Sequence, residues 1–128
     1  MTKEDKELLL KDLCARLPYG VIINCNGKNE MLYTVAERGF LEVNDRFLIE
    51  DCKPYLRSMS SMTREEENEY HMFLEFSYND YDGTSTTCVD IHRVEEYLNW
   101  LNAHHFDFRR LIEKGLAIEA PEGMYKTK

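Results

Sequence analysis

The sequence predicts an α+β fold: an N-terminal helix, a four-stranded antiparallel meander, and a C-terminal region of about three helices that packs on the meander. Three features lead to this prediction. Apolar residues recur at helical spacing before residue 18, short apolar runs alternate with turn residues between residues 20 and 49, and helical spacing returns after residue 63. The chain has 128 residues, of which 43% are hydrophobic and 12% aromatic, so residues 1–128 can form one domain without a disulfide or a metal.

The first helix is predicted over residues 3–17. Thr2 and Asp5 have the spacing of a capping box, in which each side chain accepts a hydrogen bond from the backbone of the other. Leucines follow at helical spacing from Leu9 onward, and Pro18 cannot continue a helix. This helix and the meander together occupy residues 1–57.

Four short strands should follow, with tight turns between them. The strongest turn signal is Asn26-Gly27, because both residues tolerate the positive φ of a type I′ turn. Pro54 should end the sheet region, since a proline cannot donate to a central ladder. The meander needs a helix on its apolar face, and it can also close into a small barrel resembling an SH3-like fold. The predicted strands are residues 20–25, 30–35, 40–43 and 46–49.

The helical region is predicted over residues 63–120. Thr63 and Glu66 form a second capping box, which begins a helix that runs to about Phe76. Residues 77–87 are polar and rich in turn formers, so we expect a loop there. The next helix should begin near Val89 or Asp90. Its buried face is predicted to carry the apolar residues Ile91, Val94, Leu98 and Leu101.

The stretch LNWLNAHHFDFRRLIEKGL, residues 98–116, contains the chain's only tryptophan. We expect His104 and His105 in the last turn of the third helix, and Asp107 as the cap of a short fourth helix over residues 108–114. Gly115 should then take the left-handed position that ends a helix. Residues 116–120 are predicted to be extended, and residues 121–128 to form a loose tail.

Charge and cysteine spacing exclude several classes of function. The formal net charge is −8, with −1 on residues 1–62 (nine basic, ten acidic) and −7 on residues 63–128 (seven basic, fourteen acidic). Such a field repels phosphates, so we expect no direct nucleic-acid binding. The N-terminus carries charges of both signs and no long apolar run, which argues against a secretory signal or a membrane span. We therefore expect a cytoplasmic protein whose four cysteines, none in a CxxC motif, are reduced.

A metal or acid–base site at His104, His105 and Asp107 is the main chemical alternative, with His71 or His92 as a further ligand. However, adjacent residues point in different directions, so we favour a structural role for this cluster and predict no metal, no cofactor and no catalytic residue. Residues 79–84 resemble part of a calcium loop, but they lack two essential ligands.

A binding surface is the other candidate kind of site. Tyr78 and Tyr81 lie in the polar stretch that we expect to be a loop, and tyrosines with no core to join suit an interface. We therefore predict a weak binding surface at these two residues.

Three segments together resemble one protein family: LPYGVIIN, CKPYLRSMSSMTREEENEY and WLNAHHFDFRRLIEKGLAIEAPEGMY. Their pattern is similar to that of a family of small uncharacterised (hypothetical) proteins associated with prophages and mobile elements of gut anaerobic bacteria. The resemblance covers most of the chain. It implies a cytosolic accessory protein and, since the family has no known activity, it assigns no functional residues.

The sequence thus favours a non-enzymatic intracellular accessory protein that binds another protein or self-associates. Neither a membrane nor a small-molecule ligand is predicted. One alternative is a small metal-dependent enzyme that uses the two histidines and Asp107. The other is an acidic nucleic-acid mimic, which requires the carboxylates of the second half to form one continuous strip.

Overall fold

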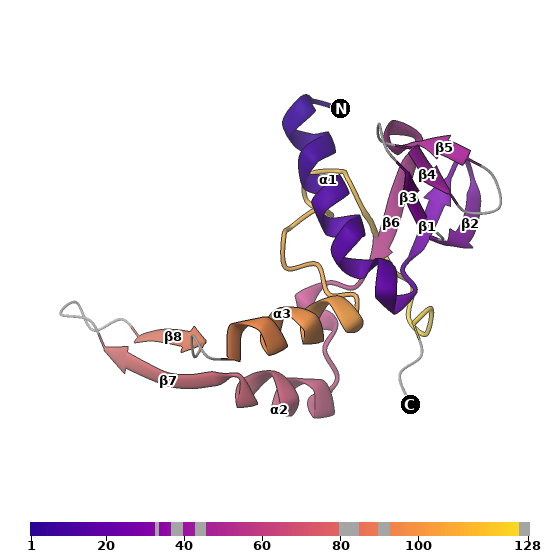
Figure 1. Ribbon diagram of the computed structural model, residues 1–128. Helices are drawn as coiled ribbons and strands as arrows, with labels where there is room; N and C mark the ends of the chain where they lie inside the picture. The colour runs from indigo at the N-terminus through magenta and orange to yellow at the C-terminus, as the bar shows by residue number, and fades with distance from the viewer. Residues whose placement is uncertain (33, 37–39, 43–45, 80–84, 90–92, 126–128) are drawn as a thin grey trace.

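The computed structural model describes residues 1–32, 34–36, 40–42, 46–79, 85–89 and 93–125 (Figure 1). The fold is α+β, as predicted, and it begins with helix α1, Lys3–Arg16. Thr2 and Asp5 form the expected capping box. Short 3-10 turns occupy Leu17–Tyr19, Ile49–Asp51 and Met59–Ser61.

The first sheet has four strands in the order β2-β1-β6-β9. Strands β1 (Ile22–Cys25) and β2 (Lys28–Met31) form the predicted hairpin. Its turn residues have φ angles of 52° at Asn26 and 90° at Gly27, the positive values that a type I′ turn requires. Strand β6 (Cys52–Leu56) pairs antiparallel with β1, and β9 (Ile118–Glu119) pairs parallel with β6.

The prediction of one antiparallel meander was wrong in two respects. The sheet is mixed, because β9 returns from the far end of the sequence and lies parallel to β6. In addition, β3 (Thr34–Ala36), β4 (Phe40–Glu42) and β5 (Arg46–Leu48) form a separate three-stranded antiparallel sheet. Strand β6, and not β3, which follows β2 in sequence, pairs with the second edge of β1. The SH3-like closure stays a prediction.

Pro54 lies inside β6 and does not end the sheet, contrary to expectation. It pairs with Ile23 of β1, and β9 pairs with β6 only at Tyr55 and Leu56. Since residues of an antiparallel pair alternate between bonded and non-bonded positions, Pro54 can occupy a non-bonded position toward β1. On its other side β6 is an edge strand at that point, where a proline is tolerated.

The hydrophobic core lies between α1, the first sheet and the segment after residue 110. Leu9 and Leu13 of α1 are fully buried against it, and a disulfide joins Cys25 of β1 to its direct partner Cys52 of β6. The expectation of four reduced thiols was therefore wrong for these two cysteines, because the register places them opposite each other. Among the residues whose burial the structure describes, the same core also contains Val21, Ile23, Leu32, Ile49, Leu56, Leu111, Leu116 and Ala117.

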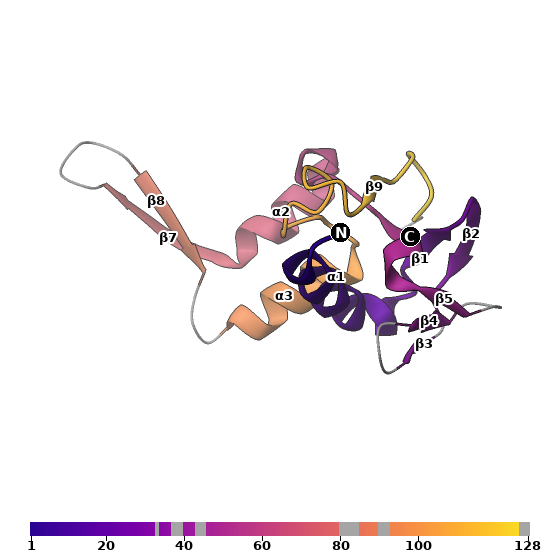
Figure 2. The same cartoon turned by 90° about the horizontal axis from the view of Figure 1, so that it is seen from above.

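The chain then leaves the body and forms an arm of two helices and a hairpin: α2 (Arg64–Met72), β7 (Leu74–Asn79), β8 (Ser85–Val89) and α3 (Val94–Ala103). In Figures 1 and 2 the β7–β8 hairpin projects away from the rest of the molecule. We call residues 64–103 the arm, and the remainder the body.

Within the arm, three predicted boundaries were wrong. Helix α2 ends at Met72 instead of about Phe76, and Val89 belongs to β8 rather than to the next helix. The expected loop at residues 77–87 contains strand residues 77–79 and 85–87, whose serines and threonines pair across the hairpin. Threonine and tyrosine favour strands despite their polarity. A loop prediction that counts only polar residues therefore misses the strands. Asp90, Ile91 and Tyr81 lie outside the described residues.

The predicted fourth helix, residues 108–114, was also wrong, because the segment forms turns and Arg110 has a φ of 60°. Asp107 still binds backbone N–H groups, but at four and five residues further on instead of the two or three of an N-cap, whereas Gly115 behaves as expected. The Asp107 carboxylate accepts hydrogen bonds from the backbone N–H groups of Leu111 (2.8 Å) and Ile112 (3.0 Å). Gly115 has a φ of 74° and donates to the Ile112 carbonyl, as a Schellman ending requires.

The segment expected to be a loose tail contains a residue that is fixed to the sheet. The Tyr125 hydroxyl accepts a hydrogen bond from the Ile22 N–H (2.7 Å) and donates toward the Tyr55 carbonyl (2.8 Å). The chain is therefore anchored as far as Tyr125, while residues 126–128 lie outside the described residues.

Candidate functional site

An ion pair joins the arm to the body. Arg57 follows β6, and its two terminal nitrogens donate to the two carboxylate oxygens of Glu66 on α2, at 2.7 and 2.6 Å. The Arg57 guanidinium also lies over the Phe106 ring, 4.3 Å from its centre. Hydrogen bonds from Arg57 and from the Thr63 backbone outweigh the effect of burial and lower the pKa of Glu66 to about 2.

The three residues predicted as a possible metal site face different partners. His104 Nδ1 lies 3.1 Å from Glu66, and its ring lies 4.5 Å from Trp100. His105 stacks on Tyr125 at 3.7 Å, while Asp107 binds backbone N–H groups. Within the described residues, no group of three or more His, Cys, Asp or Glu side chains is placed to hold a metal ion. His92 lies outside those residues.

His105 takes the left-handed position at the end of α3, with a φ of 62°. The Phe106 N–H donates to the Leu101 carbonyl and the His105 N–H donates to the Asn102 carbonyl, which is the same ending that Gly115 makes later. Burial, followed by the charge of Arg16, lowers the pKa of His105 to about 4. His105 is therefore neutral near pH 7 and acts as a structural residue.

A buried ionic network lies beneath the same corner of the fold. Asp12 and Arg16 of α1 are both fully buried, and Arg16 Nε donates to Asp12 at 2.9 Å. Arg109 Nη1 donates to the other Asp12 oxygen at 2.6 Å. One carboxylate thus holds two guanidinium groups, and the network ties α1 to the turns after α3.

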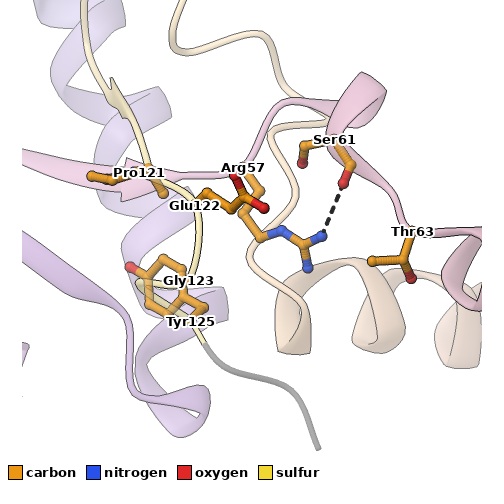
Figure 3. A pocket seen from close by; sticks show the side chains of 8 residues that line it. Arg57, Ser61, Thr63, Pro121, Glu122, Gly123 and Tyr125 are labelled. Carbon is orange, nitrogen blue, oxygen red and sulfur yellow. Dashed lines mark hydrogen bonds between the residues drawn. The ribbon is translucent and has the colours of Figure 1, made fainter.

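A cavity of 520 Å³ lies between the tail and the start of α2, as Figure 3 shows. Arg57 points into it, but its guanidinium is already paired with Glu66 and also donates to the Ser61 carbonyl. The positive charge that would attract an anionic ligand is therefore neutralised locally. The lining residues are Arg57, Ser61, Thr63, Ala120, Pro121, Glu122, Gly123 and Tyr125.

Aromatic side chains fill the space between the two helices of the arm. Tyr70 of α2 and Phe73, which directly follows α2, lie within 6.1 Å of Tyr97 and Trp100 of α3, measured between ring centres. The Trp100 Nε1–H donates to Glu69 at 2.8 Å. These contacts hold α2 and α3 together as one unit that reaches beyond the body.

The apolar face predicted for the third helix is only partly buried. Leu101, near the body, is fully buried, but Val94 and Leu98 on the same face retain 43% and 39% of their surface exposed. The prediction that these two residues pack in the core was wrong, because α3 extends past the body. Met72, at the adjacent end of α2, is 67% exposed.

The arm carries the whole net charge of the protein. Residues 64–103 hold ten Asp and Glu, two Arg and no Lys, a net of −8, while the other 88 residues have fourteen charges of each sign. A division at residue 63 groups the arm with residues 104–128, which hold five basic and four acidic residues, and so understates this asymmetry. Tyr78, a predicted interface residue, lies in β7 of the arm and pairs with Thr86.

Comparisons with known proteins found no matching family model, no matching curated protein and no matching solved structure. Among the described residues, no helix combines the length and the apolar character needed to cross a membrane. The geometry of the arm and of its junction with the body is thus the basis for a functional assignment.

Proposed function

We propose that this protein is a non-enzymatic accessory protein that binds another protein through its arm. The single observation that carries the proposal is the incomplete burial of the apolar face of α3. Val94 and Leu98 continue the line of the buried Leu101 but remain exposed. Exposed apolar side chains that continue a packed face are typical of an interaction surface.

Two further observations support this proposal. The Arg57–Glu66 pair and the packing of Trp100 on Phe106 hold the arm to the body, so the arm presents a preorganised surface. Arg57, which lines the cavity, is paired with Glu66, and Glu66 also contacts His104. This arrangement favours binding over catalysis. A cytoplasmic location is part of the proposal as well, and the Cys25–Cys52 disulfide is of a kind that is rare in that compartment.

Site-directed cross-linking tests the proposed function. A photoreactive amino acid at position 98 of the full-length protein should capture a partner, or a second copy, in extract from cells that carry the gene. The same amino acid at position 31 provides the matched control, because Met31 is 60% exposed but lies on the body. A protein that runs as a monomer and gives no cross-linked product from position 98 refutes the proposal.

A further inference from the structure

The arm has an apolar stripe inside an acidic surface, and this combination indicates the chemistry of its partner. We propose that Val94 and Leu98, which we call the α3 stripe, dock a protein surface rich in lysine and arginine that also contributes an apolar contact. This inference rests on the proposed function and adds the class of partner to it.

The geometry of α3 places the stripe where a partner can reach it. Residues at spacings of 3 and 4 share one helix face, so Val94, Leu98 and Leu101 are aligned. The body covers that face at Leu101 and leaves the other two residues exposed. Arg93 Nη1 donates to the Met72 carbonyl at 2.6 Å, which brings the exposed Met72 close to the start of the stripe.

The charge of the arm selects the partner. Glu95 lies next to the stripe in sequence and is exposed, as are Glu65 and Glu67 on α2. Two arginines offset only part of this field, because residues 64–103 hold ten acidic groups. Arg93 is held by Glu96, the Met72 carbonyl and the Phe73 ring, and Arg64 lies at the start of α2.

Other occupants are disfavoured by the same charges. A second copy that docked arm to arm would bring together two segments that each carry a formal net charge of −8, and nucleic acid would add phosphates to an acidic field. A basic protein gains long-range attraction from the carboxylates and short-range burial from the α3 stripe. Of these occupants, a basic protein surface alone gains from both features of the arm.

The protein contains its own reporter for binding at this site. Trp100 is the only tryptophan, and it lies two residues beyond Leu98 on α3 with its indole N–H on Glu69. Tryptophan fluorescence of the full-length protein therefore follows the arm without any label. The probe is an amphipathic helical peptide of leucine and lysine, and the control peptide has glutamate in place of each lysine.

We expect the lysine peptide to bind and the glutamate peptide not to bind. Leu98→Ser should weaken binding of the lysine peptide by about 10-fold, because it removes an apolar contact without changing charge. Met31→Ser on β2 is the matched control and should change the affinity by less than about twofold. Equal effects of these two substitutions, or equal binding of the two peptides, overturn the inference.

A second pair of variants separates local from overall charge. Glu95→Gln with Glu96→Gln removes two carboxylates from the first turn of α3, and Glu4→Gln with Glu7→Gln removes two exposed carboxylates from α1. At about 0.1 M salt, where screening limits the field to about 10 Å, the first pair should weaken binding at least about fivefold and the second pair less than about twofold. Equal weakening by both pairs contradicts a site on the arm.

The natural partner distinguishes this inference from the proposed function. A protein cross-linked from position 98 whose contacting surface is rich in lysine and arginine supports both. A captured protein with an acidic or neutral surface leaves the proposed function intact and overturns the inference. Failure to capture any protein removes the proposed function, while the peptide measurements still report whether the arm prefers basic ligands.

Discussion

Replacing Asp12 by asparagine is expected to be the most destabilising conservative substitution in the body. The Asp12 carboxylate is fully buried and accepts hydrogen bonds from Arg16 at 2.9 Å and Arg109 at 2.6 Å. Asparagine keeps the shape but removes the charge, so the buried Arg16 loses its counterion. Breaking a buried pair from one side costs about 3–5 kcal/mol, a large part of a typical total of about 5–15 kcal/mol.

Urea unfolding followed by circular dichroism measures this loss as a change in the free energy of unfolding. Asp51→Asn is the control, since it makes the same chemical change at an exposed position and should shift stability by less than about 0.5 kcal/mol. Both variants should retain the wild-type dependence on urea concentration if they unfold in the same two-state manner.

Arg16→Met tests whether the unpaired charge causes the loss. This substitution removes the buried cation, leaves Asp12 paired with Arg109, and eliminates the Arg16 Nη1 atom, which has no hydrogen-bond partner. It should cost less than Asp12→Asn, and the double variant should be more stable than Asp12→Asn alone. A loss below about 1 kcal/mol for Asp12→Asn, or strictly additive effects in the double variant, refutes the reasoning.

Three other predictions concern pH, redox state and backbone conformation. Because the pKa of His105 is lowered to about 4 in the folded protein, folding favours the neutral imidazole. The free energy of unfolding should therefore be highest above pH 6.5 and decrease by about 3 kcal/mol as the pH falls to 4. Asparagine tolerates positive φ, so His105→Asn should fold and should lose this pH dependence when urea unfolding at pH 7 is compared with pH 4.5. An unchanged pH dependence contradicts the assignment to His105. Reducing the Cys25–Cys52 disulfide, which spans 27 residues, should lower stability by about 3–4 kcal/mol in the same assay, whereas no change on adding reductant contradicts a structural bond. Gly115→Ala should lower the free energy of unfolding by about 1 kcal/mol, because alanine is strained at a φ of 74°. No atom lies within 4 Å of the added methyl group, so a loss above about 3 kcal/mol would indicate an unexpected steric clash.

Sequence signals for helix ends, which depend only on residues close together in the chain, gave correct predictions. Thr2 with Asp5, and Thr63 with Glu66, both form their capping boxes, and Gly115 takes its left-handed position. Each of these interactions depends on backbone groups one helical turn away, so the local sequence contains all the information that is needed.

Pairings between distant segments could not be predicted in the same way. Strand β9 reaches β6 from about sixty residues further along the chain, and nothing in its two residues, Ile118 and Glu119, specifies that partner. The β7–β8 hairpin was hidden by its polar composition, and its loop lies outside the described residues. Such contacts depend on which edge is free after the rest of the body has folded.

The junction of the candidate site shows the same limit. The sequence identified Glu66 as a capping residue, but its ion pair with Arg57 and its contact with His104 span 9 and 38 residues. Oε1 of Glu66 accepts from both the Thr63 N–H and Arg57, while Oε2 accepts from Arg57. A capping glutamate that also closes a distant ion pair therefore looks identical in sequence to one that does not.

The distribution of charge gives the arm a different physical character from the body. In the body, acidic groups are balanced in number by basic groups, and the buried Asp12 is matched by two arginines. In the arm, the aromatic contacts of Tyr70 and Phe73 with Trp100 hold together two helices that both carry several carboxylates. Like charges on neighbouring helices oppose that packing. A cationic partner relieves this repulsion when it docks, so the energy that the arm loses through self-repulsion becomes a contribution to binding.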